Sequence, residues 1–95
     1  MLKGDMQEYT YLFDAILSLK TKEECAAFFD DLLTIAELQA AAQRLKVAGM
    51  LYNNNTCSTV AKATGASTAT VSRVNKCLHY GPGGYKLVLD RLLQK

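Results

Sequence analysis

Apolar residues recur every three or four positions along most of the chain, which is the spacing of helices that bury one face. In the first half, this spacing predicts three helices over residues 6–20, 21–32 and 34–52. Thr21 with Glu24, and Thr34 with Glu37, form Thr-x-x-Glu capping boxes that predict where the second and third helices begin. The second helix is expected to bury Cys25, Phe28, Phe29 and Leu32. The pattern therefore indicates an all-α chain.

The third predicted helix is apolar on several sides, because Val47 and Met50 lie outside the stripe that runs from Ile35 to Leu51. A helix of this kind is buried from more than one direction. A chain of 95 residues can hardly supply that cover itself, so a second copy is the simplest source. We therefore expect a homodimer in which residues 1–53 form the helical dimerisation core.

Residues 56–80 have the layout of a helix-turn-helix motif. Thr56 can cap the first helix, Gly65 can end it with a positive φ, and Ser67 can cap the second helix. Apolar residues would pack between the two helices, with Ala61 small at their crossing; they are Val60, Ala66, Val71 and Val74. These positions fit one packed unit, which makes the signal stronger than a short motif alone.

A glycine-rich segment follows the motif, at residues 81–84. Its proline removes a backbone donor and its glycines permit turns, so the second motif helix must end there. No strand precedes the segment and no Gly-Lys-Ser/Thr follows it, so we expect a chain reversal rather than a nucleotide site. A last helix is expected over residues 84–95, which brings the expected number of helices to six.

The outward side of the second motif helix predicts a contact with double-stranded DNA. Its residues are small, hydroxylic or cationic, so the helix N-terminus can enter a major groove while its free N–H groups favour phosphate. We predict base contacts from Thr68, Ala69, Thr70 and Ser72. We predict phosphate contacts from Thr56, Ser67, Arg73 and Lys76. In a symmetric dimer, two such helices would meet half-sites about 34 Å apart on a roughly palindromic target.

Charge is distributed unevenly along the chain, although the net charge is only +2. Residues 1–37 hold eight acidic side chains and three lysines, whereas the remainder holds eight basic side chains and Asp90. No acidic residue lies between Glu37 and Asp90, so a phosphate backbone that approaches the motif would meet no local repulsion. This distribution favours nucleic acid as the partner.

Composition and motifs exclude several classes of protein. With 49% hydrophobic and 21% charged residues, the chain is expected to fold as a single domain over residues 1–95. No apolar run approaches the length of a membrane span and the N-terminus lacks the order of a signal peptide, so we expect a cytoplasmic protein. Three widely spaced cysteines fit a reducing compartment, with Cys25 and Cys77 as packing residues. We identify no catalytic residues and no metal ligands, and expect no enzyme activity.

Two stretches carry a resemblance to a known family. TIAELQAAAQRLKVAGML and TGASTATVSRV resemble the Trp repressor superfamily, in particular its YerC/YecD-type members. The likeness covers roughly residues 10–93 and is specific in GASTATVSRV and in Leu38–Leu45. The resemblance implies a six-helix Trp-repressor-like fold, an intertwined homodimer and a bacterial transcriptional regulator, with a repressor as the expected kind.

The resemblance also bears on a small-molecule ligand. In Trp repressor two arginines hold the tryptophan corepressor, and by alignment Arg44 and Arg73 take their places. Val74 stands where that repressor has a glycine, and its branched side chain would fill part of the pocket. We therefore expect no cofactor, with both arginines serving phosphates. Two alternatives stay open: a regulator that responds to a tryptophan-like amino acid at Arg44 and Arg73, and a helix-turn-helix module that docks on protein.

Overall fold

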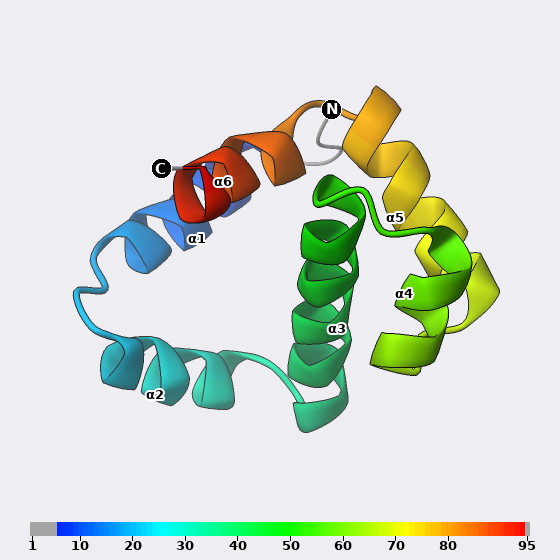
Figure 1. The fold of residues 1–95 in the computed structure, drawn as a ribbon. Helices are drawn as coiled ribbons and strands as arrows, with labels where there is room; N and C mark the ends of the chain where they lie inside the picture. The colour runs from blue at the N-terminus through cyan, green and yellow to red at the C-terminus, as the bar shows by residue number, and fades with distance from the viewer. Residues whose placement is uncertain (1–5, 95) are drawn as a thin grey trace. The chain divides into compact units, whose positions relative to one another are not determined.

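The computed structural model describes residues 6–94, which contain six α-helices and no strand (Figure 1). The helices are α1 (Met6–Leu17), α2 (Lys22–Leu32), α3 (Ile35–Tyr52), α4 (Cys57–Thr64), α5 (Thr68–Tyr80) and α6 (Gly84–Leu93). This order confirms the expected all-α, six-helix architecture. None of the helices in this part of the chain is long and apolar enough to cross a membrane.

The first helix is shorter than its apolar pattern predicts, because it ends at Leu17 rather than at Lys20. The backbone N–H groups of Ser18 and Leu19 donate to carbonyls three residues back, at Ala15 and Ile16. Such bonds close a helix with a tighter turn. The chain then enters α2 through the cap at Thr21.

The chain divides into two compact units, and the boundary lies inside α3, after Leu38. The first unit contains α1, α2 and the first turn of α3, and the second contains the rest of α3 with α4, α5 and α6. Each unit is described by itself below.

The first unit has formed helices but no buried residue in α1 or α2. Tyr11 and Leu17 are each 81% exposed, and Ile35 in the first turn of α3 is 70% exposed. An apolar groove of about 410 Å³ lies open along the unit, and Leu12, Ala15, Phe28 and Leu32 are among its lining residues. The apolar sides of these helices are therefore available to a further partner.

The expected burial of the apolar face of α2 is wrong for the single chain. Cys25, Phe28 and Phe29 are only half-buried, and Leu32 is 47% exposed. The rings of Phe28 and Phe29 meet edge to face at 5.4 Å between centroids, but both lie on α2 itself. Two short helices cannot close around such a face, because each lacks a second layer to pack against.

Both predicted caps at the starts of α2 and α3 form, with one difference between them. At α3, the Thr34 N–H donates to Glu37 Oε1 at 2.9 Å and the Glu37 N–H donates to Thr34 Oγ1 at 3.1 Å. The bond from the Thr34 backbone, followed by that from its hydroxyl, lowers the pKa of Glu37. At α2, the Glu24 N–H donates to Thr21 Oγ1, but Glu24 Oε1 accepts from the N–H of Lys20, one residue before the cap.

The second unit has a closed core of small and medium-sized aliphatic residues. It draws on α3, α4, α5, α6 and the turn between α4 and α5, and consists of Val47, Ala48, Leu51, Val60, Ala66, Val71, Val74 and Leu89. Five of these side chains are at most 2% exposed, namely four valines and Ala48. The core therefore sits directly beneath the helix-turn-helix motif and fixes the orientation of its helices.

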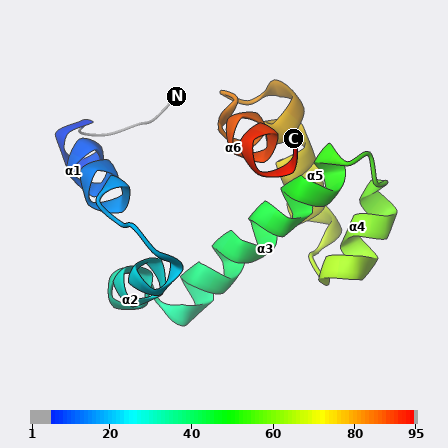
Figure 2. The same cartoon turned by 60° about the vertical axis from the view of Figure 1, so that its left-hand side comes forward.

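A polar contact joins α6 to the end of α3, and both views place these two segments side by side (Figures 1 and 2). The Tyr52 hydroxyl donates to Asp90 Oδ1 at 2.6 Å, and Lys86 Nζ lies 3.1 Å from Asp90 Oδ2. The hydrogen bond from Tyr52, with a further one from Lys86, lowers the pKa of Asp90. The same bond to Asp90 is the main reason why the pKa of Tyr52 is raised.

The Tyr52–Asp90 contact predicts that the stability of the fold decreases at both high and low pH. Because the pKa of Tyr52 is raised in the folded state, its contribution is complete below the ordinary tyrosine value of 10.0 and is lost as pH rises through the folded pKa. The pKa of Asp90 is lowered, so its contribution is present above 3.8 and is lost as pH falls through the folded value. Denaturant unfolding midpoints measured across pH should therefore fall at both ends.

Tyr52→Phe should lower the midpoint at neutral pH and should also flatten its decrease at high pH. Tyr80→Phe is the control, since Tyr80 is 85% exposed. A gap between the unmodified protein and Tyr52→Phe that stays constant above pH 10 would contradict this role.

Candidate nucleic-acid interface

The turn between α4 and α5 is fixed by the backbone of Gly65, which has φ 72° and ψ 6°. In this left-handed conformation the Gly65 N–H donates to the carbonyl of Ala61 at 3.0 Å and closes the end of α4. A Cβ added at Gly65 would meet no atom within 4 Å. The glycine is therefore required for its backbone conformation and not for space.

Hydroxyl side chains cap both helices of the motif, as the sequence predicted. Thr56 Oγ1 accepts the N–H of Thr59 and Ser67 Oγ accepts the N–H of Thr70, each at 3.1 Å. Each capping hydroxyl also donates to the hydroxyl three residues later, at 2.9 Å in α4 and 3.0 Å in α5. Thr56, Ser67 and Thr70 thus have local hydrogen-bond partners, which orient the first turn of each helix.

The predicted buried positions of the motif are confirmed. Val60, Val71 and Val74 are at most 2% exposed, Ala66 is 7% exposed, and Ala61 is half-buried. These side chains hold α4 against α5, which is the most extensive helix pairing within residues 6–94. Their burial leaves the opposite side of α5 open to solvent.

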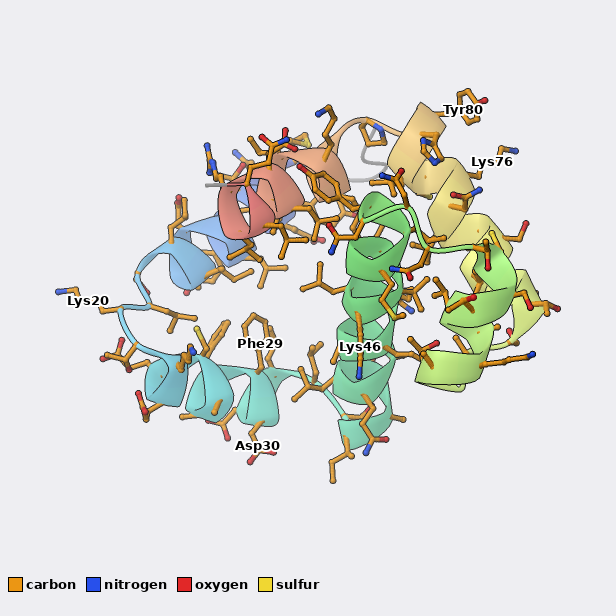
Figure 3. The ribbon with its side chains drawn as sticks, viewed as in Figure 1. Lys20, Phe29, Asp30, Lys46, Lys76 and Tyr80 are labelled. Atoms are coloured by element: carbon orange, nitrogen blue, oxygen red, sulfur yellow. The ribbon has the colours of Figure 1, made fainter. Side chains whose placement is uncertain are left out.

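The predicted DNA-contacting residues are exposed to solvent, with one exception. Seven of them are exposed: Thr56, Ser67, Thr68, Ala69, Ser72, Arg73 and Lys76. Thr70 is half-buried, and its hydroxyl accepts a hydrogen bond from Ser67 Oγ at 3.0 Å. Figure 3 shows Lys76 and Tyr80 projecting from α5 away from the ribbon. Their contacts with DNA stay a prediction.

The positive charges of the motif are not neutralised by neighbouring acids. Within residues 6–94 the salt bridge is between Lys86 and Asp90, so Lys62, Arg73 and Lys76 form none. Arg44, the other arginine of the predicted ligand pair, is exposed as well. The surface of the second unit can therefore attract a polyanion with most of its basic side chains.

A groove between α4 and α5 places Cys57, Ser58 and Lys62, which the sequence analysis did not assign, beside predicted residues of the motif. It has a volume of about 530 Å³ and is lined by Cys57, Ser58, Ala61, Lys62, Thr68, Val71 and Ser72. The α4 residues recur at spacings of three and four, which place them on one side of that helix. That spacing is the sequence signal that these residues share one side of α4.

The burial of Val74 bears on the predicted ligand site. Val74 is 2% exposed and packs in the core, so its side chain helps to hold the motif together.

Cys77 is exposed and lines a separate groove with Leu45 and Tyr85, so the expectation that it packs in the core is wrong for the single chain. Cys25 is half-buried and Cys57 is exposed, and all three cysteines are free.

Comparison with known proteins agrees with this arrangement. The family model described as Trp repressor protein matches residues 7–93. The chain belongs to the Trp repressor family. The uncharacterized protein YerC of Bacillus subtilis (strain 168) is 56% identical over 86 residues, which cover 90% of this chain and 83% of YerC.

Solved structures of the Trp repressor type have the same fold. A TrpR-like protein from Eubacterium eligens ATCC 27750 matches with a TM-score of 0.88 and 49% identity, over 93% of this chain and 91% of that one. A candidate Trp repressor from Staphylococcus aureus matches with a TM-score of 0.89 and 45% identity, over 98% and 91% of the two chains. Trp-repressor-like proteins are DNA-binding regulators and not enzymes.

The Gly65 turn predicts opposite effects for two glycine substitutions in this Trp repressor family member. Gly65→Ala should destabilise the protein by about 1–2 kcal/mol, because alanine is strained at positive φ. Gly49→Ala should stabilise it by about 0.5–1 kcal/mol, because alanine favours the helix interior. A Cβ at Gly49 would make ordinary contact with Leu89 Cδ2 at 3.8 Å. Thermal or denaturant unfolding measures the stability of both variants. Equal effects of the two substitutions would contradict the requirement for glycine at position 65.

Proposed function

We propose that this chain is a cytoplasmic, sequence-specific regulator of transcription, a repressor, that binds double-stranded DNA as a homodimer through α4 and α5. The observation that carries this function is the open N-terminal half of α5, held outward by the buried valines beneath it. A helix presented in this way fits a major groove. Membership of a family of DNA-binding regulators supports the same conclusion. The three free cysteines fit a reducing cytoplasm.

Electrostatics supports DNA as the partner of this surface. The sequence between Glu37 and Asp90 contains no acidic residue, and Asp90 itself is paired with Lys86 at 3.1 Å. The basic side chains of the motif therefore act together on an approaching phosphate backbone. We assign phosphate contacts to Thr56, Ser67, Arg73 and Lys76. We assign base contacts to Thr68, Ala69 and Ser72. The half-buried Thr70 stays a proposed base contact as well.

Uncovered apolar surface supports the homodimer. The first unit has no buried residue in α1 or α2, and large apolar side chains of α6 are exposed too, with Leu87 at 52% and Leu92 at 64%. An isolated protein in water rarely leaves so many large apolar residues open. In the dimer the 95 residues form one domain, and residues 1–53 serve as its dimerisation core.

Ligand-independent binding is part of the proposed function. Val74 is packed in the core at the position where a corepressor pocket would need space, and both Arg44 and Arg73 are exposed and can serve phosphates. We therefore propose no cofactor for the DNA-bound state.

Arg73→Ala should weaken binding to duplex DNA and reduce its dependence on salt. Loss of one phosphate contact lowers the slope of log K against log salt by about one unit. The measurement is a titration of affinity by fluorescence anisotropy at several salt concentrations. Lys20→Ala is the matched control, because it removes one positive charge outside the motif (Figure 3).

The same titration tests both the role of Arg73 and the DNA-binding function. Equal slopes for Arg73→Ala and the unmodified protein would remove Arg73 from the interface. Absence of binding to any duplex at low salt would remove the DNA-binding function itself, since a basic surface of this kind should show at least non-specific affinity.

Leu17→Glu should convert the protein from a dimer to a monomer. Leu17 is 81% exposed in the single chain, so a charge there costs a monomer little but would be buried in the dimer. Sedimentation should give twice the chain mass of 10.4 kDa for the unmodified protein and the single mass for the variant. Lys22→Glu, at an exposed polar position of the same unit, should stay dimeric. A monomeric unmodified protein at micromolar concentration would contradict the proposed dimer.

A further inference from the structure

The groove between α4 and α5 has an apolar floor and a polar rim. The floor consists of Val71, which is 1% exposed, and the half-buried Ala61. The rim consists of exposed residues of both helices, namely Cys57, Ser58, Lys62, Thr68 and Ser72. Its volume of about 530 Å³ is sufficient for the edge of a base, and the groove borders the first turn of α5.

The rim hydroxyls differ from the capping hydroxyls in their hydrogen bonds. Thr56, Ser67 and Thr70 are engaged in the caps, as described above. The hydroxyls of Ser58, Thr68 and Ser72, in contrast, make no hydrogen bond within residues 6–94, so they are free to meet an external partner. All three line the groove. The available polar groups of the motif thus surround an apolar hollow.

The chemistry of this hollow fits one feature of the DNA major groove. The thymine C5-methyl is the apolar group that a base pair presents there, and alanine and threonine methyls are its usual protein partners. Ala61, Val71 and Thr68 supply such methyl groups on the floor and rim. Lys62 on the rim complements the phosphates on either side, and no acidic residue lies in the surrounding sequence to oppose them.

We infer that the groove between α4 and α5 reads a thymine methyl in each half-site, with Ala61 and Val71 as its floor and Thr68 as the discriminating residue at its rim. The inference rests on the proposed DNA-binding function and adds to it a base preference. The small residues of α4 then have a role in specificity: a larger or charged side chain at Ser58 or Ala61 would fill the hollow and exclude the methyl group.

The test begins with a duplex selected from a random pool by the full-length protein. Each thymine is then replaced singly by deoxyuridine, which removes only the methyl group and keeps base pairing. One position in each half-site should lose affinity by about fourfold, which corresponds to the transfer of one methyl group out of water. Replacement at both symmetry-related positions should multiply the two losses.

A variant of the protein locates the contact. Thr68→Ser removes the γ-methyl and keeps the hydroxyl, so it should bind the thymine and deoxyuridine duplexes more nearly equally. Thr59→Ser is the matched control, because it makes the same chemical change on α4 outside the groove and should keep the full preference. Circular dichroism and thermal unfolding would check that both variants fold.

The possible results separate the two levels of inference. Strong binding with no sensitivity to deoxyuridine at any position would overturn the methyl readout and leave DNA binding intact. A deoxyuridine effect that Thr68→Ser leaves unchanged would also overturn it, because the methyl would then be read elsewhere. Failure to bind any duplex would reject the proposed function and with it this inference.

Discussion

Burial of valine side chains across the α4–α5 crossing is the interaction on which the rest of the structure depends. Val60 on α4 and Val71 and Val74 on α5 are almost completely enclosed, and they pack only if the chain reverses sharply between the two helices. Gly65 permits that reversal through its left-handed backbone. The turn and the core therefore depend on each other. Because α5 has a single buried face, the packing of that face also orients its other side toward solvent.

The first unit shows what happens where such a constraint is missing. Its helices α1 and α2 have 12 and 11 residues, lengths at which a helix in water is only marginally stable without packing. Capping at Thr21 and Thr34 satisfies the backbone at their junctions but buries no apolar surface. The difference between the units is therefore one of layers: the second unit closes a core with four helices, whereas the first presents apolar sides to solvent.

Much of this structure could be predicted from the sequence because its determinants are local. Thr56, Gly65 and Ser67 each specify a helix boundary through their own backbone or side chain, and all three boundaries form as predicted. The length of α1 and the exposure of Leu32 could not be predicted, since periodicity shows which side of a helix is apolar but not what covers it. The groove beside Ala61 was also missed, because it depends on how two helices are spaced and not on any residue type. Likewise, only the structure shows which hydroxyls are engaged in a helix cap, such as that of Thr70, and which are free, such as that of Thr68.

The pairing of Asp90 has a consequence for how fast a partner could be found. Asp90 carries the one side-chain carboxylate beyond Glu37, and Lys86 lies 3.1 Å from it while Tyr52 donates a second bond. A charge compensated at such short range behaves as a dipole, and the potential of a dipole decays with distance more steeply than that of a single ion. Several ångströms away, the second unit thus acts as an almost purely cationic body. Within a Debye length, about 8 Å at physiological ionic strength, an approaching polyanion therefore meets this local cationic field, although the total charge of the chain is modest.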